Sequence, residues 1–152
     1  MAQGRYGFHL QVYGEPHEAD NPVYVNIVPI TIEIPISRHL ACKIASIGSI
    51  RIGSEVGVGN LGGSFGIPWY LQSLEDGPDG FFVGPIVLIS KNQYTREIVI
   101  SSAIDLGYSF LLSDHISLSA GAEIGLSTFF PPDDPIANRP HFGPAVYLYF
   151  SP

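Results

Sequence analysis

The chain has 152 residues and a mass of 16.5 kDa, enough for one domain and too little for two ordinary ones. Charged residues make up 14% of it, against about 25% in soluble proteins, and the mean hydropathy is +0.23. The net charge of −7 argues against nucleic-acid binding, and the lack of roughly 18 consecutive apolar residues excludes a membrane-spanning helix. Such a chain must cover its apolar surface with a partner or expose that surface to lipid. If it crosses a membrane without a helix, only a closed β-barrel can span the bilayer, because hydrocarbon cannot satisfy open strand edges.

The first half of the chain alternates apolar residues with small or polar ones, which is the period of a β-strand. Ile30, Ile32 and Ile34 form the clearest of these rows. We expect strands at residues 5–14, 23–37, 42–59 and 64–73. We expect the intervening loops or turns at residues 15–22, 38–41, 60–63 and 74–80.

The second half repeats this pattern. Residues 81–90 are nearly all apolar and show no clear face, whereas the segments after them alternate cleanly. We expect strands at residues 81–90, 94–112, 116–130 and 141–150, and turns or loops at residues 91–93, 113–115 and 131–140. Eight strands without a convincing helix predict an all-β chain, folded as a single domain over residues 1–152.

The polar face of these strands has an unusual composition. In a soluble sandwich or lipocalin that face meets water and is rich in Lys, Glu, Thr and Arg. Here it is mostly Gly, Ser and Ala, which suit the crowded interior of a small barrel. We therefore predict an eight-stranded antiparallel up-and-down transmembrane β-barrel with short turns and loops, whose isoleucine rows face lipid.

Several charged residues fall on the predicted inner face, where each needs a partner because an unpaired buried charge costs several kcal/mol. A network of this kind serves to satisfy itself more often than to catalyse a reaction. The predicted interior network consists of Glu33, Lys43, Arg51, Glu55, Glu97, Asp105 and Glu123.

Aromatic residues gather toward the segment ends, as they do in the girdles of membrane barrels, although core packing would explain some of them equally well. The predicted interface aromatics are Tyr6, Phe8, Trp69, Tyr108, Phe110, Phe130, Phe142 and Phe150. An even strand count predicts both termini on the periplasmic side. The extracellular loops are then 15–22, 60–63, 91–93 and 131–140, and the periplasmic turns are 38–41, 74–80 and 113–115.

The final strand resembles the C-terminal insertion signal of bacterial outer-membrane barrels. In residues 141–150 a glycine is followed by alternating apolar or aromatic residues that end at a Phe, although Ser151 and Pro152 follow it. Residues 106–121 are similar to the strand, short turn and strand units of small OmpA-like and OmpX-like barrels.

This resemblance implies a Gram-negative outer membrane, with lipid and lipopolysaccharide as surroundings. It also implies recognition by the barrel-insertion machinery through Gly143, Val146, Leu148 and Phe150. The first four residues lack the basic head and apolar run of a signal peptide. Because an outer-membrane protein must be exported, we expect a mature chain whose signal peptide has been removed and to which Met1 was added.

Three functions follow from these features. The first is a barrel with a filled lumen in a structural, adhesive or partner-binding role, rather than a porin. The second is a lipid A-modifying membrane enzyme, for which His17, with Asp20 nearby, is the candidate histidine, although a solvated loop histidine is the plainer interpretation. The third is a soluble lipocalin-like carrier of an apolar ligand, although the sole tryptophan lies in mid-chain rather than near the N-terminus.

No cofactor, metal or catalytic set is predicted. Cys42 is the only cysteine, so it gives no disulfide or metal-site spacing. The other histidines lie on separate predicted strands and turns without ligand spacing: His9, His39, His115 and His141.

Overall fold

The computed structural model describes residues 4–14, 22–27, 30–74, 79–132 and 134–152, and the prediction of an all-β fold is confirmed for them. The strands are β1 (Arg5–Gly14), β2 (Val23–Asn26), β3 (Ile30–Pro35), β4 (Ala41–Ile52), β5 (Val56–Gly66), β6 (Trp69–Tyr70), β7 (Gly80–Asn92), β8 (Ile98–Ser113), β9 (Ile116–Phe130) and β10 (Ala137–Phe150). Among these residues, no helix is long and apolar enough to cross a membrane.

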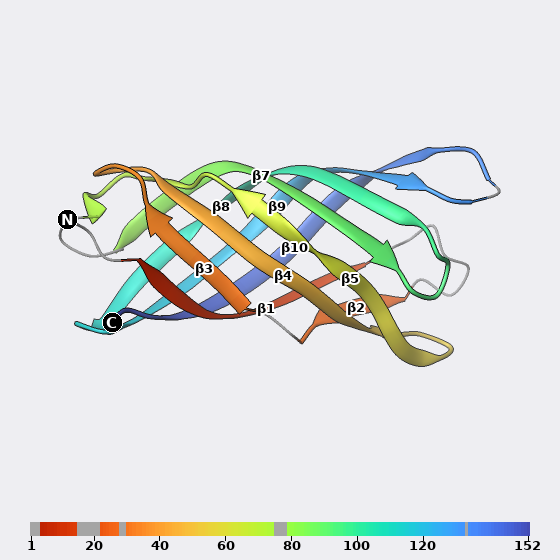
Figure 1. The fold of residues 1–152 in the computed structure, drawn as a ribbon, viewed down its shortest axis with the longest axis horizontal. Helices are drawn as coiled ribbons and strands as arrows, with labels where there is room; N and C mark the ends of the chain where they lie inside the picture. The colour runs from red at the N-terminus through yellow and green to blue at the C-terminus, as the bar shows by residue number, and fades with distance from the viewer. Residues whose placement is uncertain (1–3, 15–21, 28–29, 75–78, 133) are drawn as a thin grey trace.

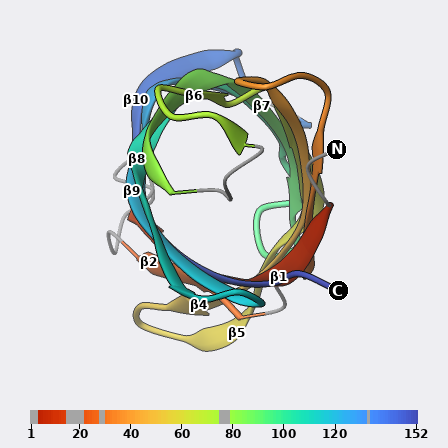
Figure 2. The ribbon, with the colours of Figure 1, turned by 90° about the vertical axis from the view of Figure 1, so that its left-hand side faces the viewer.

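The strands form one antiparallel sheet that closes into a ring, because β10 pairs with β1 (Figure 2). β2 and β3 both pair with β1 on one side and β4 on the other, so they share one position. β6 follows β5 along the same neighbour, β7. The ten described strands therefore occupy eight positions around the ring.

The two ends of the ring differ. Both chain termini lie at one end, which we call the terminal end (Figure 1). The β4–β5, β7–β8 and β9–β10 connections lie at the other, which we call the far end (Figure 1). A side chain's position along its strand therefore says how close it lies to either end.

Two predicted strands, 5–14 and 116–130, have the bounds of β1 and β9. β10 begins at Ala137, so the prediction of a loop through 140 is wrong for its last four residues. Pro140 is tolerated there because β10 pairs only with β9 until Ala145, where the register with β1 starts. A proline lacks an amide hydrogen, which matters least on an unpaired strand side.

The prediction of a turn at 60–63 is wrong. These residues lie inside β5 and pair with β4 and β7, and the chain reverses at 53–55 instead. The glycines mark a close approach of two backbones, which a sequence does not distinguish from a turn. A Cβ atom on Gly62 would lie 2.0 Å from the carbonyl oxygen of Ile89 on β7.

Gly62→Ala is expected to lower the free energy of unfolding by about 1–3 kcal/mol, because the added methyl group must push β5 and β7 apart. Gly57→Ala is the matched control on the same strand, since nothing lies within 4 Å of its Cβ position. Urea titration of both variants, folded under the same conditions, measures the difference. Equal stabilities would contradict the close packing of β5 on β7.

Exposed apolar side chains alternate with buried polar ones along the strands. Ile32 and Ile44 are 45% and 50% exposed, whereas their neighbours Glu33 and Lys43 are 2% and 3% exposed. Because the buried face of a single closed sheet is its inside, the outward orientation predicted for these isoleucines is confirmed. A smaller apolar cluster does face inward and consists of Ile47, Ile86, Leu88 and Ala103.

Candidate functional site

The interior near the terminal end is organised around a buried arginine. The β1–β3 register places Arg5 directly opposite Glu33, and the guanidinium donates two hydrogen bonds to Glu33 Oε1, 2.8 Å from Nη2 and 3.1 Å from Nε. The Tyr70 hydroxyl donates to the same oxygen at 2.9 Å, and Arg5 Nη1 donates to Ser117 Oγ at 2.9 Å. The guanidinium lies 3.9 Å from the centre of the Tyr149 ring. Charge, aromatic and hydroxyl groups thus fill this level of the ring.

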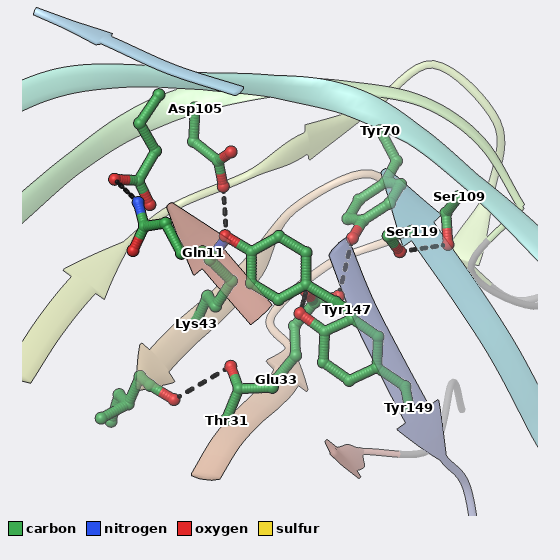
Figure 3. Close-up of polar contacts among 12 residues, drawn as sticks. Gln11, Thr31, Glu33, Lys43, Tyr70, Asp105, Ser109, Ser119, Tyr147 and Tyr149 are labelled. Atoms are coloured by element: carbon green, nitrogen blue, oxygen red, sulfur yellow. Dashed lines mark hydrogen bonds and ion pairs between the residues drawn. The ribbon is translucent and has the colours of Figure 1, made fainter. Parts of the chain in front are cut away.

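A second buried pair lies one level further in. Lys43 of β4 forms an ion pair with Asp105 of β8, and these strands are not neighbours in the sheet. The pair therefore crosses the inside of the ring. Lys43 Nζ also donates to the Tyr147 hydroxyl at 3.3 Å and lies 4.3 Å from the centre of that ring (Figure 3). This crossing closes the middle of the ring with side chains.

A third group lies toward the far end and links β1, β8, β9 and β10. Gln11 Nε2 donates to Glu123 Oε2 at 2.7 Å. His141 Nε2 lies 3.3 Å from the same carboxylate oxygen, and its Nδ1 lies 3.3 Å from Ser127 Oγ. Ser127 Oγ is 2.6 Å from Ser101 Oγ. We call Ser101, Ser127, His141 and Glu123 the serine–histidine–glutamate cluster.

A cavity of about 30 Å³ lies beside this cluster, which is room for about two water molecules. Its walls are partly polar and partly apolar. They comprise Gln11, Tyr13, Ile47, Asn60, Leu88, Ser90, Val99, Ser101, Ser127, Phe129, Arg139, Pro140 and His141. The described interior therefore contains a small chamber of mixed polar and apolar lining near the far end, above the two ion pairs.

The predicted interior network is only partly brought together. Glu33, Lys43, Asp105 and Glu123 lie inside the ring, each buried. Arg51 is also buried, but it lies at the far end, where its guanidinium is 4.2 Å from the centre of the Tyr94 ring.

The interior placement predicted for Glu55 is wrong, whereas Glu97 is half-buried. Glu55 is exposed in the 53–55 reversal, and its contact with Arg51 is through its backbone carbonyl oxygen, at 3.0 Å. Glu97 lies just before β8 and accepts a hydrogen bond from Thr95 Oγ1 at 2.9 Å. The exposure of Glu55 follows from the position of the turn. The strand predicted at 42–59 would place Glu55 on the inner face, but the chain reverses at 53–55.

Arg5, Gln11 and His141 also belong to these interior groups, although they are not part of the predicted network. The sequence does carry a signal for Arg5, because this residue starts the alternating inner row that continues with Gly7 and His9. Spacing along the chain leaves His141 isolated, since only the β9–β10 register brings it opposite Gly125, beside Ser127 and Glu123. Cross-strand proximity of this kind is not visible in spacing along the chain.

The predicted interface aromatics all lie on the outer face, and Phe150 is half-buried there. Near the terminal end the centre of the Phe150 ring lies 6.1 Å from that of Tyr6 and 6.5 Å from that of Phe8. Phe130 ends β9 at the far end. Among the residues predicted to contact insertion machinery, Val146 and Leu148 also face outward, whereas Gly143 is buried.

Comparison with known proteins gives no family: no family model matches the chain, and no curated protein matches it. His17 and Asp20, the predicted candidates for lipid A chemistry, lie outside the described residues. In the described part of the chain, no group of three or more His, Cys, Asp or Glu side chains is placed to hold a metal ion.

Proposed function

We propose that the chain is an eight-stranded transmembrane β-barrel of a Gram-negative outer membrane, with a filled lumen and a structural, adhesive or partner-binding role. The observation that carries the proposal is the outer face of the ring. Large apolar side chains are exposed on every one of its ten described strands, and on β6 this side chain is Trp69. A hydrophobic surface that runs around a whole molecule far exceeds the patches that soluble monomers expose.

The energetics favour lipid as the cover for this surface. Removing one large aliphatic side chain from water contributes about 1.5–3 kcal/mol, so leaving a full ring of them in water would be costly. Pairing of β10 with β1 also closes the sheet, and hydrocarbon requires a closed sheet because it leaves no water to satisfy open strand edges. The charges of the Arg5 and Lys43 pairs lie inside, where acyl chains do not reach them.

The interior supports a plugged barrel rather than a porin. The Lys43–Asp105 pair crosses the lumen, and Arg5 with its aromatic neighbours fills the level below it. Eight strands enclose a space just wide enough to be filled by side chains. A lipocalin-like carrier needs an apolar lining instead, and the buried side chains here include many charged and hydroxyl groups.

Membrane lipid and lipopolysaccharide are the proposed surroundings. The proposed contact with insertion machinery uses Val146 and Leu148 on the outer face of β10, together with Gly143 and Phe150. The terminal end, where the short 114–115 turn joins β8 to β9, is the proposed periplasmic side. These assignments rest on the resemblance of residues 141–150 to an insertion signal.

Folding in detergent tests the proposal. The unboiled protein is expected to migrate differently from the boiled protein on a denaturing gel, because folded outer-membrane barrels resist detergent at room temperature. In planar bilayers it is expected to show no steady conductance, since side chains close the lumen. A chain that stays monomeric and folded in detergent-free buffer would overturn the membrane assignment, and a stable open channel would overturn the plugged lumen.

A further inference from the structure

The serine–histidine–glutamate cluster forms one directed chain of hydrogen bonds. An ionised carboxylate only accepts, so the His141 tautomer that fits the contact with Glu123 carries its hydrogen on Nε2. In that tautomer Nδ1 is an acceptor to which the Ser127 hydroxyl can donate. Either hydroxyl of the Ser101–Ser127 pair can be the donor, so Ser101 can donate to Ser127 Oγ at the same time. All the hydroxyl hydrogens of this arrangement point toward the carboxylate.

This order is the one that activates a serine nucleophile. A histidine that accepts the hydroxyl hydrogen can act as its general base, and a carboxylate on the other ring nitrogen fixes the tautomer and stabilises the imidazolium. Both contacts of His141 are 3.3 Å, a length that does not exclude a general base, because catalytic hydrogen bonds tighten when substrate binds. The two ring nitrogens exchange roles relative to serine proteases, although either nitrogen is a competent base.

The arrangement is not general to the serines of this interior. Ser119 also lies buried on β9 and donates to Ser109 of β8 at 2.9 Å, as Ser101 and Ser127 bond across the same two strands. No hydrogen bond from a histidine is recorded for that pair in the described residues. A pair of hydrogen-bonded serines therefore fills the space between β8 and β9 without a histidine, so interior packing alone does not require His141 and Glu123 beside the Ser101–Ser127 pair.

The cluster also opens onto space for a reacting group. Ser101, Ser127 and His141 all line the cavity of about 30 Å³, so the Ser127 hydroxyl has room beside it. Arg139 lines the same cavity and brings a permanent positive charge. A cation beside the attacked carbonyl stabilises the oxyanion that forms there.

We propose that Ser127, His141 and Glu123 hydrolyse short-chain carboxylic esters at the far end of the ring. Ser127 Oγ attacks the ester carbonyl carbon while its proton passes to His141 Nδ1. The carbon–oxygen bond to the alcohol breaks, and the alcohol leaves with that proton. Water, deprotonated by His141, then attacks the acyl-serine, releases the carboxylic acid and restores the Ser127 hydroxyl.

The size and position of the cavity define the substrate class. Room for about two water molecules accepts an acetyl-sized acyl group and excludes a fatty acyl chain. The position of the cavity inside the ring, away from the outer apolar face, favours a water-soluble ester over a lipid. The activity goes beyond the proposed membrane function and does not involve His17.

The test uses the full chain folded in detergent, with a fluorophosphonate probe and p-nitrophenyl acetate. The probe is expected to form an adduct on Ser127 in the unaltered protein, located by mass spectrometry of peptides. Ser127→Ala and His141→Gln are expected to lower ester hydrolysis about a hundredfold, the scale of a general base. Ser119→Ala is the matched control and is expected to keep the full rate.

The adduct is detected in the unaltered protein, so this measurement does not depend on whether a variant folds. No adduct on Ser127, or an equal hydrolysis rate in Ser127→Ala and Ser119→Ala when both show the folded gel migration, would overturn the proposal. A fatty ester hydrolysed faster than the acetate would overturn the assigned substrate class.

Discussion

Lys43→Met is expected to lower the free energy of unfolding by about 3–5 kcal/mol, because it leaves the Asp105 carboxylate buried without its cation. The two groups pair across the lumen, and both side chains are almost fully enclosed. A single replacement therefore removes a partner that no water can substitute. Urea titration of the protein in lipid vesicles measures the loss.

The double variant Lys43→Met with Asp105→Asn tests whether the unpaired Asp105 charge causes the loss of stability. It removes both charges, so most of the lost free energy is expected to return. Lys91→Met, an exposed cation on β7, controls for the loss of a lysine and is expected to change stability by less than about 0.5 kcal/mol. A double variant as unstable as Lys43→Met would show that the pair itself does not cause the effect.

Ile104→Arg is expected to destabilise the vesicle-inserted protein by about 2–4 kcal/mol, the cost of an arginine on the lipid face near the bilayer midplane. Ile104 is 46% exposed on the outer face of β8, in the middle of the strand. The cost arises because the guanidinium must be drawn out of water into hydrocarbon.

Ile98→Arg is the matched control on the same strand and the same face. Ile98 starts β8 at the far end, where an arginine reaches the polar interface and costs only about 0–1 kcal/mol. Both are compared by urea titration from vesicles. An equal loss of stability at both positions would mean that the environment of this face does not change along the strand, which would argue against a bilayer around it.

The sequence predicts the strands better than the connections. Period-two alternation locates β1 and β9 to the residue, because each side of the ring presents a different environment to successive side chains. The prediction fails at 60–63, because glycine is needed both in a turn and where two backbones come close together, as those of β5 and β7 do at Gly62. The register shift between Gly48 and Ile50 adds to the error by breaking the alternation of β4.

The sequence predicts which charged residues lie inside the ring, but not which of them pair with one another. Alternation gives the face of Glu33, Lys43, Asp105 and Glu123, and the fold places all four inside. It does not give depth along the ring or the neighbour across it. The pairing of Lys43 with β8 depends on how the sheet closes, which no local pattern contains.

Quenching of the only tryptophan by brominated phospholipids tests whether lipid surrounds the ring. Trp69 is 42% exposed and forms a bridge with Leu40, just before β4 begins, so the unaltered protein carries its own probe. In vesicles, bromines near the headgroups are expected to quench its fluorescence strongly, and aqueous iodide only weakly. Strong quenching by iodide with no effect of any brominated lipid would mean that water, not acyl chains, surrounds the ring.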